Sequence, residues 1–246
     1  MKKTALIPAR YASTRLPGKM LQDIGGKPLI VRTYEAVVAT GLFDEVVVVC
    51  DDSRIFDAVK NQGGAVVMSQ KEHACGTDRI AEAVSLLPPT DIVLNVQGDE
   101  PFTEKESLAA LLAVFEQDNA QDIKVASLMH LLTDEQDIAD PNQVKVVVDK
   151  QQNALLFSRS PIPYRRDRSA SVHYYKHIGI YAFRRDTLAW FAGLPQSPME
   201  QVEQLENLRL LENGVPIKMV LTEHRPIGID TESDLEKARL KFESKG

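Results

Sequence analysis

The stretch Leu6-Ile7-Pro8-Ala9-Arg10, followed by Ser13-Thr14-Arg15-Leu16-Pro17-Gly18-Lys19, decides how the rest of this chain is interpreted. The apolar run at 4–7 predicts a buried strand, which leads into a loop with two arginines, a lysine and a Pro-Gly turn. A strand that ends in a basic loop presents cations to a polyphosphate at the carboxyl edge of an α/β sheet. The loop lacks the spacing of a Walker P-loop or of a G-x-G-x-x-G turn. We therefore expect a nucleoside triphosphate held by side chains as well as by glycine backbone.

The pattern along the chain predicts an α/β fold with a mostly parallel central sheet, because strand-like and helix-like runs alternate through the first half. Further strands are expected at 45–50, 65–68 and 91–96, and helices at 28–39, 54–61, 78–87 and 104–117, with Ser53 as the cap of the second helix. In the second half we expect a strand pair at 144–148 and 154–158, strands at 174–183 and 217–221, and helices at 199–211 and 232–242. We find no linker, so one domain over 1–246 is expected, with an inserted β subregion at about 140–185.

The composition is that of an ordinary soluble globular protein. The chain has 246 residues, 43% of them hydrophobic and 26% charged, and a net charge of −6 that argues against nucleic acid as the main partner. The apolar runs are too short to cross a membrane, and the first strand leaves no room for a secretory signal, so we expect a cytoplasmic protein without membrane insertion. Its two cysteines, Cys50 and Cys75, do not form a disulfide framework or a zinc site.

Two aspartates follow short apolar runs in a way that suits a metal site. Asp99 comes after the expected strand at 91–96 and a glycine, and Asp230 comes after the run at 226–229. Carboxylates from two strand ends, completed by phosphate oxygens and water, are a ligand set that Mg²⁺ prefers. The alternative is that Asp99 caps a turn and Asp230 caps the last helix. For Asp230, the residues by themselves favour the cap.

The opening loop and five further segments resemble the 3-deoxy-manno-octulosonate (KDO) cytidylyltransferase family, also called CMP-KDO synthetases. The five segments are Gly76-Thr77-Asp78-Arg79, Asn95-Val96-Gln97-Gly98-Asp99-Glu100-Pro101, Phe157-Ser158-Arg159-Ser160-Pro161-Ile162-Pro163, His177-Ile178-Gly179-Ile180-Tyr181 and Ile229-Asp230-Thr231. The resemblance spans nearly the whole chain. It implies a three-layer α/β/α nucleotidyltransferase fold of Rossmann-like type. It also implies the reaction CTP + KDO → CMP-KDO + pyrophosphate, for lipopolysaccharide synthesis, with Mg²⁺ as cofactor and a homodimer formed through the inserted subregion.

The resemblance also implies roles for individual residues. The implied catalytic residues are Lys19, Arg10, Asp99 and Asp230, of which Asp99 and Asp230 are the metal ligands. The implied nucleotide-binding residues are Pro8, Ala9, Arg10, Arg15, Lys19, Gly76, Thr77 and Asp99. The implied sugar-binding residues are Arg79, Gln97, Arg159, His177, Tyr181 and Glu206.

Some of these roles have alternatives. Gln97 can bond a sugar hydroxyl or a base edge, or be a polar residue at a strand end, and His177 can be a satisfied core histidine. Many relatives have Glu where this chain has Asp78, and Gln where it has Asn207. The alternative functions are therefore the same cytidylyl transfer to 8-amino-KDO or another acid sugar and, from a different class, a non-catalytic nucleotide-binding protein.

Overall fold

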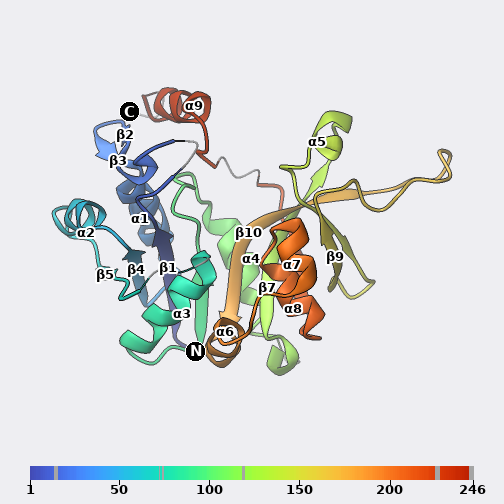
Figure 1. The fold of residues 1–246 in the computed structure, drawn as a ribbon, viewed down its shortest axis with the longest axis horizontal. Helices are drawn as coiled ribbons and strands as arrows, with labels where there is room; N and C mark the ends of the chain where they lie inside the picture. Colours follow the sequence, from blue (N-terminus) through green and yellow to red (C-terminus); the bar gives the residue numbers. More distant parts are fainter. Residues whose placement is uncertain (14–15, 72, 74, 118–119, 225–227, 244–246) are drawn as a thin grey trace. The chain divides into compact units, whose positions relative to one another are not determined.

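The computed structural model describes residues 1–13, 16–71, 73, 75–117, 120–224 and 228–243. It divides into two compact units, drawn in Figure 1. Unit 1 comprises Met1–Lys105 and Pro226–Gly246, and unit 2 comprises Glu106–Arg225. The single domain expected from the sequence stays a prediction. Within the described ranges, every helix is too short or too polar to cross a membrane.

Unit 1 contains a parallel sheet in the order β6-β1-β4-β5. These strands are β6 (Ile92–Asn95), β1 (Lys3–Ala9), β4 (Glu45–Cys50) and β5 (Val66–Met68). In β1, Ala5, Leu6 and Ile7 are fully buried, so both faces of the strand are covered. Parallel strands covered on both faces are typical of α/β folds. The predicted α/β class with a mostly parallel sheet is confirmed.

The helices of unit 1 follow the predicted order. They are α1 (Leu29–Ala39), α2 (Ser53–Lys60), α3 (Gly76–Leu86) and α9 (Glu232–Glu243), with a 3-10 turn η1 (Lys19–Leu21) and a hairpin of β2 (Asp23–Ile24) and β3 (Lys27–Pro28). Helices α1 and α2 pack on β4, and α3 packs on β1. The prediction of Ser53 as a helix cap is wrong by one residue. The Asp52 carboxylate accepts the Arg54 N–H at 2.9 Å, because the helix begins one residue earlier than predicted and Ser53 is its first residue.

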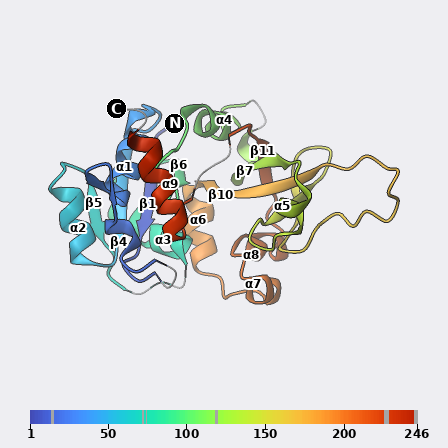
Figure 2. The same cartoon turned by 90° about the horizontal axis from the view of Figure 1, so that it is seen from above.

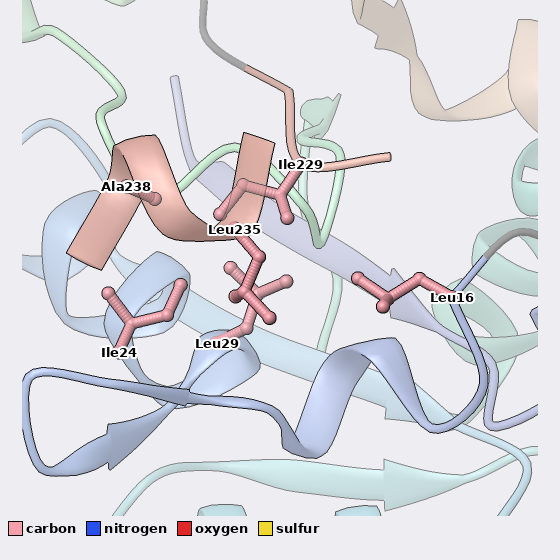
Figure 3. Close-up of a cluster of buried hydrophobic side chains, with 6 residues drawn as sticks. All are labelled: Leu16, Ile24, Leu29, Ile229, Leu235 and Ala238. Atoms are coloured by element: carbon pink, nitrogen blue, oxygen red, sulfur yellow. The ribbon is translucent and has the colours of Figure 1, made fainter. Parts of the chain in front are cut away.

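Helix α9 is joined to the opening loop by a hydrophobic cluster, shown in Figure 3. Its members are Leu16, Ile24, Leu29, Ile229, Leu235 and Ala238. Phe102 and Phe242 pack against the cluster, with ring centroids 5.0 Å apart. The helix also lies beside β2, where Arg239 Nε donates to the Asp23 carbonyl at 3.0 Å (Figures 1 and 2). The segment that leads into α9 is thereby fixed against the loop that carries Lys19.

Unit 2 is built around a long strand, β10 (Tyr174–Arg184), which pairs antiparallel with β7 (Val125–Leu132) and β8 (Lys145–Val148). Strand β8 forms a hairpin with β9 (Ala154–Ser158), which confirms the predicted strand pair, and β11 (Ile217–Leu221) runs parallel to β7. Its helices are α4 (Lys105–Ala113), α5 (Glu135–Ala139), α6 (Arg185–Ala192), α7 (Pro198–Glu203) and α8 (Asn207–Glu212), with a 3-10 turn η2 (Ala120–Asp122). The sequence did not predict β7, α5 or α6.

The single helix expected at 199–211 is wrong, because the chain breaks there into α7 and α8. Gln204 adopts a left-handed conformation with φ 53°, which ends α7. The buried Arg209 guanidinium pairs with the Glu200 carboxylate at 2.7 and 2.5 Å. This ion pair ties α8 to α7 across the break.

Candidate functional site

Unit 1 contains a cavity of about 480 Å³ at the carboxyl ends of β1 and β6. This volume is in the range of small-molecule sites. Predicted site residues that line it are Pro8, Ala9, Arg10, Lys19, Gly76, Arg79, Gln97, Asp99 and Asp230. Ser13, Met20, His73, Cys75 and Gly98 complete the lining. The structure thus brings most of the predicted nucleotide-binding residues around one space.

Two glycines shape the backbone of this cavity. A Cβ at Gly98 would lie 2.8 Å from the Pro8 carbonyl oxygen, so only glycine lets the Asp99 turn approach the end of β1. Gly18 has φ +63° and begins η1, which places Lys19 at the first position of that turn. The Pro-Gly turn predicted from the sequence therefore sets the position of the lysine.

Lys19 joins the two predicted metal ligands. Its Nζ donates to Asp99 Oδ2 at 2.6 Å and to Asp230 Oδ1 at 3.0 Å. Burial alone would lower the pKa of this ammonium, but the two carboxylates outweigh burial and hold the pKa above its ordinary value. Lys19 is therefore a fixed positive charge inside the cavity.

The capping role considered for Asp230 belongs to its neighbour. Thr231 Oγ1 accepts the Asp234 N–H at 3.3 Å, and Asp234 Oδ2 accepts the Thr231 N–H at 3.0 Å, which is a reciprocal cap at the start of α9. The Asp230 carboxylate instead points to Lys19. The Ile229 N–H donates to the Asp99 carbonyl at 3.1 Å, so the two aspartate segments are also joined through their backbones.

Arg79 lines the cavity but is engaged by the protein itself. It is 6% exposed, and its guanidinium donates from Nη1 to the Ala9 carbonyl at 2.8 Å and pairs through Nη2 with Asp51 Oδ2 at 2.9 Å. Thr77 is fully buried behind the wall and accepts a bond from Asn95 Nδ2 at 3.2 Å. The predicted nucleotide-binding residue Arg15 lies outside the described residues.

The pair His73 and Glu82 is a part of this site that sequence reasoning missed. The His73 imidazole lines the cavity and contacts the Glu82 carboxylate of α3 through Nε2. Glu82 also accepts the Gln70 N–H at 2.8 Å and the Ser69 hydroxyl at 3.0 Å, so it holds the segment that leads into the cavity. His73 lies three residues before the Gly76 motif, and that proximity was the one sequence signal for it.

The remaining predicted sugar-binding residues belong to unit 2. His177 is buried, contacts Ser127 Oγ at 3.0 Å, and lies 5.3 Å from the Tyr181 ring. Burial lowers the pKa of His177 to about 3, so its ring is neutral near pH 7. Arg159 donates to the carbonyls of Glu203, at 2.7 Å, and Pro141, at 3.0 Å.

The last two positions of interest lie at the start of α8. Glu206 occupies the position before the first residue of α8. Both polar atoms of the Asn207 amide are buried without a hydrogen-bond partner among the described residues. Buried amide groups ordinarily have a hydrogen-bond partner, so this side chain is unusual among the buried polar groups of unit 2.

Comparison with known proteins places this geometry in one family. The cytidylyltransferase family model matches residues 4–220. A 3-deoxy-manno-octulosonate cytidylyltransferase of Christiangramia forsetii is 58% identical over 96% of this chain and 94% of that protein, and one of Flavobacterium johnsoniae is 58% identical over 97% and 98%. A solved structure of CMP:2-keto-3-deoxy-manno-octonic acid synthetase complexed with CTP matches with a TM-score of 0.93, at 42% identity, over the full length of both chains.

Proposed function

The chain belongs to the cytidylyltransferase family, among the 3-deoxy-manno-octulosonate cytidylyltransferases, and from this premise we propose that it converts CTP and KDO into CMP-KDO and pyrophosphate. The observation that carries the proposal is the Lys19–Asp99–Asp230 cluster, which lies in a nucleotide-sized cavity at the carboxyl edge of a parallel sheet. A protein that only bound a nucleotide would not need a fixed ammonium next to two converging carboxylates. This arrangement therefore favours catalysis over simple binding.

Asp99 and Asp230 fit the role of Mg²⁺ ligands. Both carboxylates already converge on one cation, the Lys19 ammonium, and carboxylate oxygens are hard ligands that suit Mg²⁺. Among the described residues, this site included, no group of three or more His, Cys, Asp or Glu is arranged to hold a metal, so Mg²⁺ here would need phosphate oxygens and water to complete its ligands. When bound, Mg²⁺ would neutralise phosphate charge and make the sugar hydroxyl more acidic.

The reaction needs charge stabilisation and positioning more than covalent chemistry from the protein. A bond forms between the anomeric oxygen of KDO and the α-phosphorus of CTP, while the bond to the oxygen that bridges the β-phosphate breaks. Pyrophosphate leaves with that electron pair, and the hydroxyl proton is released. Lys19 stabilises the charge that develops on the α-phosphate, and Arg10 binds the phosphates as a planar fork.

The proposal is tested by pyrophosphate release from CTP with KDO, 8-amino-KDO or a sialic acid as the acceptor. We expect release with KDO and its loss in Asp99→Ala and Asp230→Ala. Turnover on another acid sugar alone would correct the substrate. Binding of CTP without pyrophosphate release from any of the sugars would instead support a non-catalytic binding protein.

We further propose that the protein acts as a cytoplasmic homodimer through the β subregion at about 140–185. A cytoplasmic location is supported by the use of CTP, and the dimer by the resemblance to the family. Sedimentation at micromolar concentration is the measurement, and a monomer there would contradict the dimer.

A further inference from the structure

Arg10, the expected phosphate-binding arginine, is flanked by two backbone groups that are both held by the same ion pair. On one side, the Ala9 carbonyl accepts a bond from Arg79 Nη1 at 2.8 Å. On the other, the Tyr11 N–H donates to Asp51 Oδ1 at 2.9 Å. Arg79 and Asp51 in turn pair with each other at 2.9 Å. The chain on both sides of Arg10 is therefore fixed by one closed set of polar contacts.

The topology explains why Asp51 is in reach. Strand β4 pairs parallel with β1, and Ala9 lies opposite Cys50 in the register. Asp51 follows Cys50, so it emerges at the same edge of the sheet as Arg10. Arg79 comes from the first turn of α3, which packs on β1. Three separate elements thus meet at the backbone of residues 9–11.

From this geometry we propose that the Arg79–Asp51 pair is a positioning device for Arg10, and that Arg79 acts through the protein backbone rather than as a sugar ligand. The inference rests on the proposed function, in which Arg10 binds the phosphates of CTP. The Arg79 side chain is 7% exposed. Its Nη1 donates to the Ala9 carbonyl, and its Nη2 pairs with the Asp51 carboxylate. Its charge is already matched by Asp51 and therefore is not available as an unmatched cation for the carboxylate of an acid sugar.

Tyr11 extends the same device toward Lys19. The Arg54 guanidinium stacks over the Tyr11 ring at 3.4 Å from its centroid, and a Cβ at Gly18 would lie 3.4 Å from the Tyr11 hydroxyl. The ring therefore fills the space between α2 and the Pro-Gly turn. Holding the Tyr11 backbone through Asp51 also keeps this ring against the turn that sets Lys19.

The test is a double-mutant cycle between Asp51 and Arg10, because a residue that acts through Arg10 loses its effect when Arg10 is absent. The dissociation constant of CTP is measured by calorimetry for the full chain, Asp51→Ala, Arg10→Ala and the double variant. We expect Asp51→Ala to weaken CTP binding about tenfold in the presence of Arg10, and less than twofold in its absence. The KM for KDO should stay unchanged in Asp51→Ala and in Arg79→Lys.

Asp44→Ala is the matched control. Asp44 Oδ2 accepts the Lys3 N–H at 2.7 Å, which is the same kind of bond as that from Tyr11 but at the opposite end of β1. The Asp44→Ala variant should leave CTP affinity unchanged. Should Asp51→Ala fail to fold, Asp51→Asn replaces it, because the amide oxygen still accepts the Tyr11 N–H while the charge that holds Arg79 is lost. For Asp51→Asn we expect a smaller loss of CTP affinity that again disappears in the Arg10→Ala background.

The outcomes separate this inference from the proposed function. If Arg10→Ala weakens CTP binding but the effects of the two substitutions multiply, the positioning role is wrong and the proposed function stands. If Arg79→Lys raises the KM for KDO while CTP affinity is kept, Arg79 is a sugar ligand and the inference is overturned. If Arg10→Ala leaves CTP affinity unchanged, the assigned role of Arg10 fails, and the inference fails with it.

Discussion

Replacement of Lys19 by methionine should change metal binding and turnover in opposite directions. The Lys19 ammonium lies 2.6 Å from Asp99 Oδ2 and 3.0 Å from Asp230 Oδ1, the carboxylates that we propose as metal ligands. A divalent cation and the ammonium therefore compete for the same oxygens in the nucleotide-free protein. Methionine keeps the length and the packing of the side chain but removes the competing charge.

The expected magnitude follows from the exposure of the partners. Two unit charges 4 Å apart near a protein surface interact by about 4 kcal/mol. The carboxylates of Asp99 and Asp230 are 23% and 43% exposed, so water weakens this interaction considerably. We expect Lys19→Met to bind Mn²⁺ about tenfold more tightly than the unmodified protein, which corresponds to about 1.4 kcal/mol. Its kcat should fall by about 10²–10³, because a donor to the developing charge is lost.

Mn²⁺ affinity is measured by electron paramagnetic resonance without nucleotide, and turnover by pyrophosphate release. Lys27→Met is the matched control, because Lys27 Nζ pairs with Glu35 at 2.5 Å on the surface and should alter neither property. A Mn²⁺ affinity that is unchanged or weaker in Lys19→Met would refute the competition. General unfolding would lower both metal affinity and turnover, so it is distinguishable from the expected result.

Three further predictions concern stability, and urea unfolding checks each of them. The pKa of His177 is lowered to about 3 in the folded protein, whereas the pKa of an unfolded histidine is about 6.5. Between these two pH values the unfolded chain binds more protons than the folded one. The free energy of unfolding therefore decreases as the pH is lowered. His177→Phe should therefore reduce the loss between pH 7 and pH 5 by on the order of 2 kcal/mol, and an equal loss in both proteins would contradict this. Leu235→Ala should lower the free energy of unfolding by about 2–4 kcal/mol, because it opens a fully buried cluster, and a loss below about 1 kcal/mol would argue against that packing. Glu200→Gln should cost about 3 kcal/mol, because it leaves the buried Arg209 charge without its partner, and a neutral effect would mean that water reaches the guanidinium.

The first half of the chain could be predicted well because its signals are local. Continuous apolar runs such as 45–50, bounded by turn residues, identify buried strands, and the parallel order then brings their carboxyl ends to one edge. This reasoning was sufficient to place Arg10, Lys19 and Asp99 around one cavity. It could not assign Arg79, because the choice between a ligand and the Asp51 carboxylate depends on which partner lies within 3 Å in the folded chain.

The second half was harder because its patterns are mixed. Strand β7 has the sequence Val-Ala-Ser-Leu-Met-His-Leu-Leu and is buried along nearly its whole length, so it shows neither the alternation of a half-exposed strand nor a clear helical period. Ser127, a fully buried polar residue of this strand, is another feature that the sequence did not reveal, because its role depends on the contact of its hydroxyl with His177. The break between α7 and α8 escaped prediction because Gln204 is not a residue that ordinarily marks a left-handed turn.

The cluster that ties α9 to the opening loop has a consequence for the order in which the protein folds. Lys19 and Asp230 are 211 positions apart in the sequence, so their contact closes a very long loop and has a high entropic cost. Contacts of this kind form late, after local helices and neighbouring strands are in place. We therefore expect the cavity to be among the last parts of unit 1 to be completed during folding. CTP, which we propose binds this completed cavity, would then bind the native state alone and stabilise it by mass action.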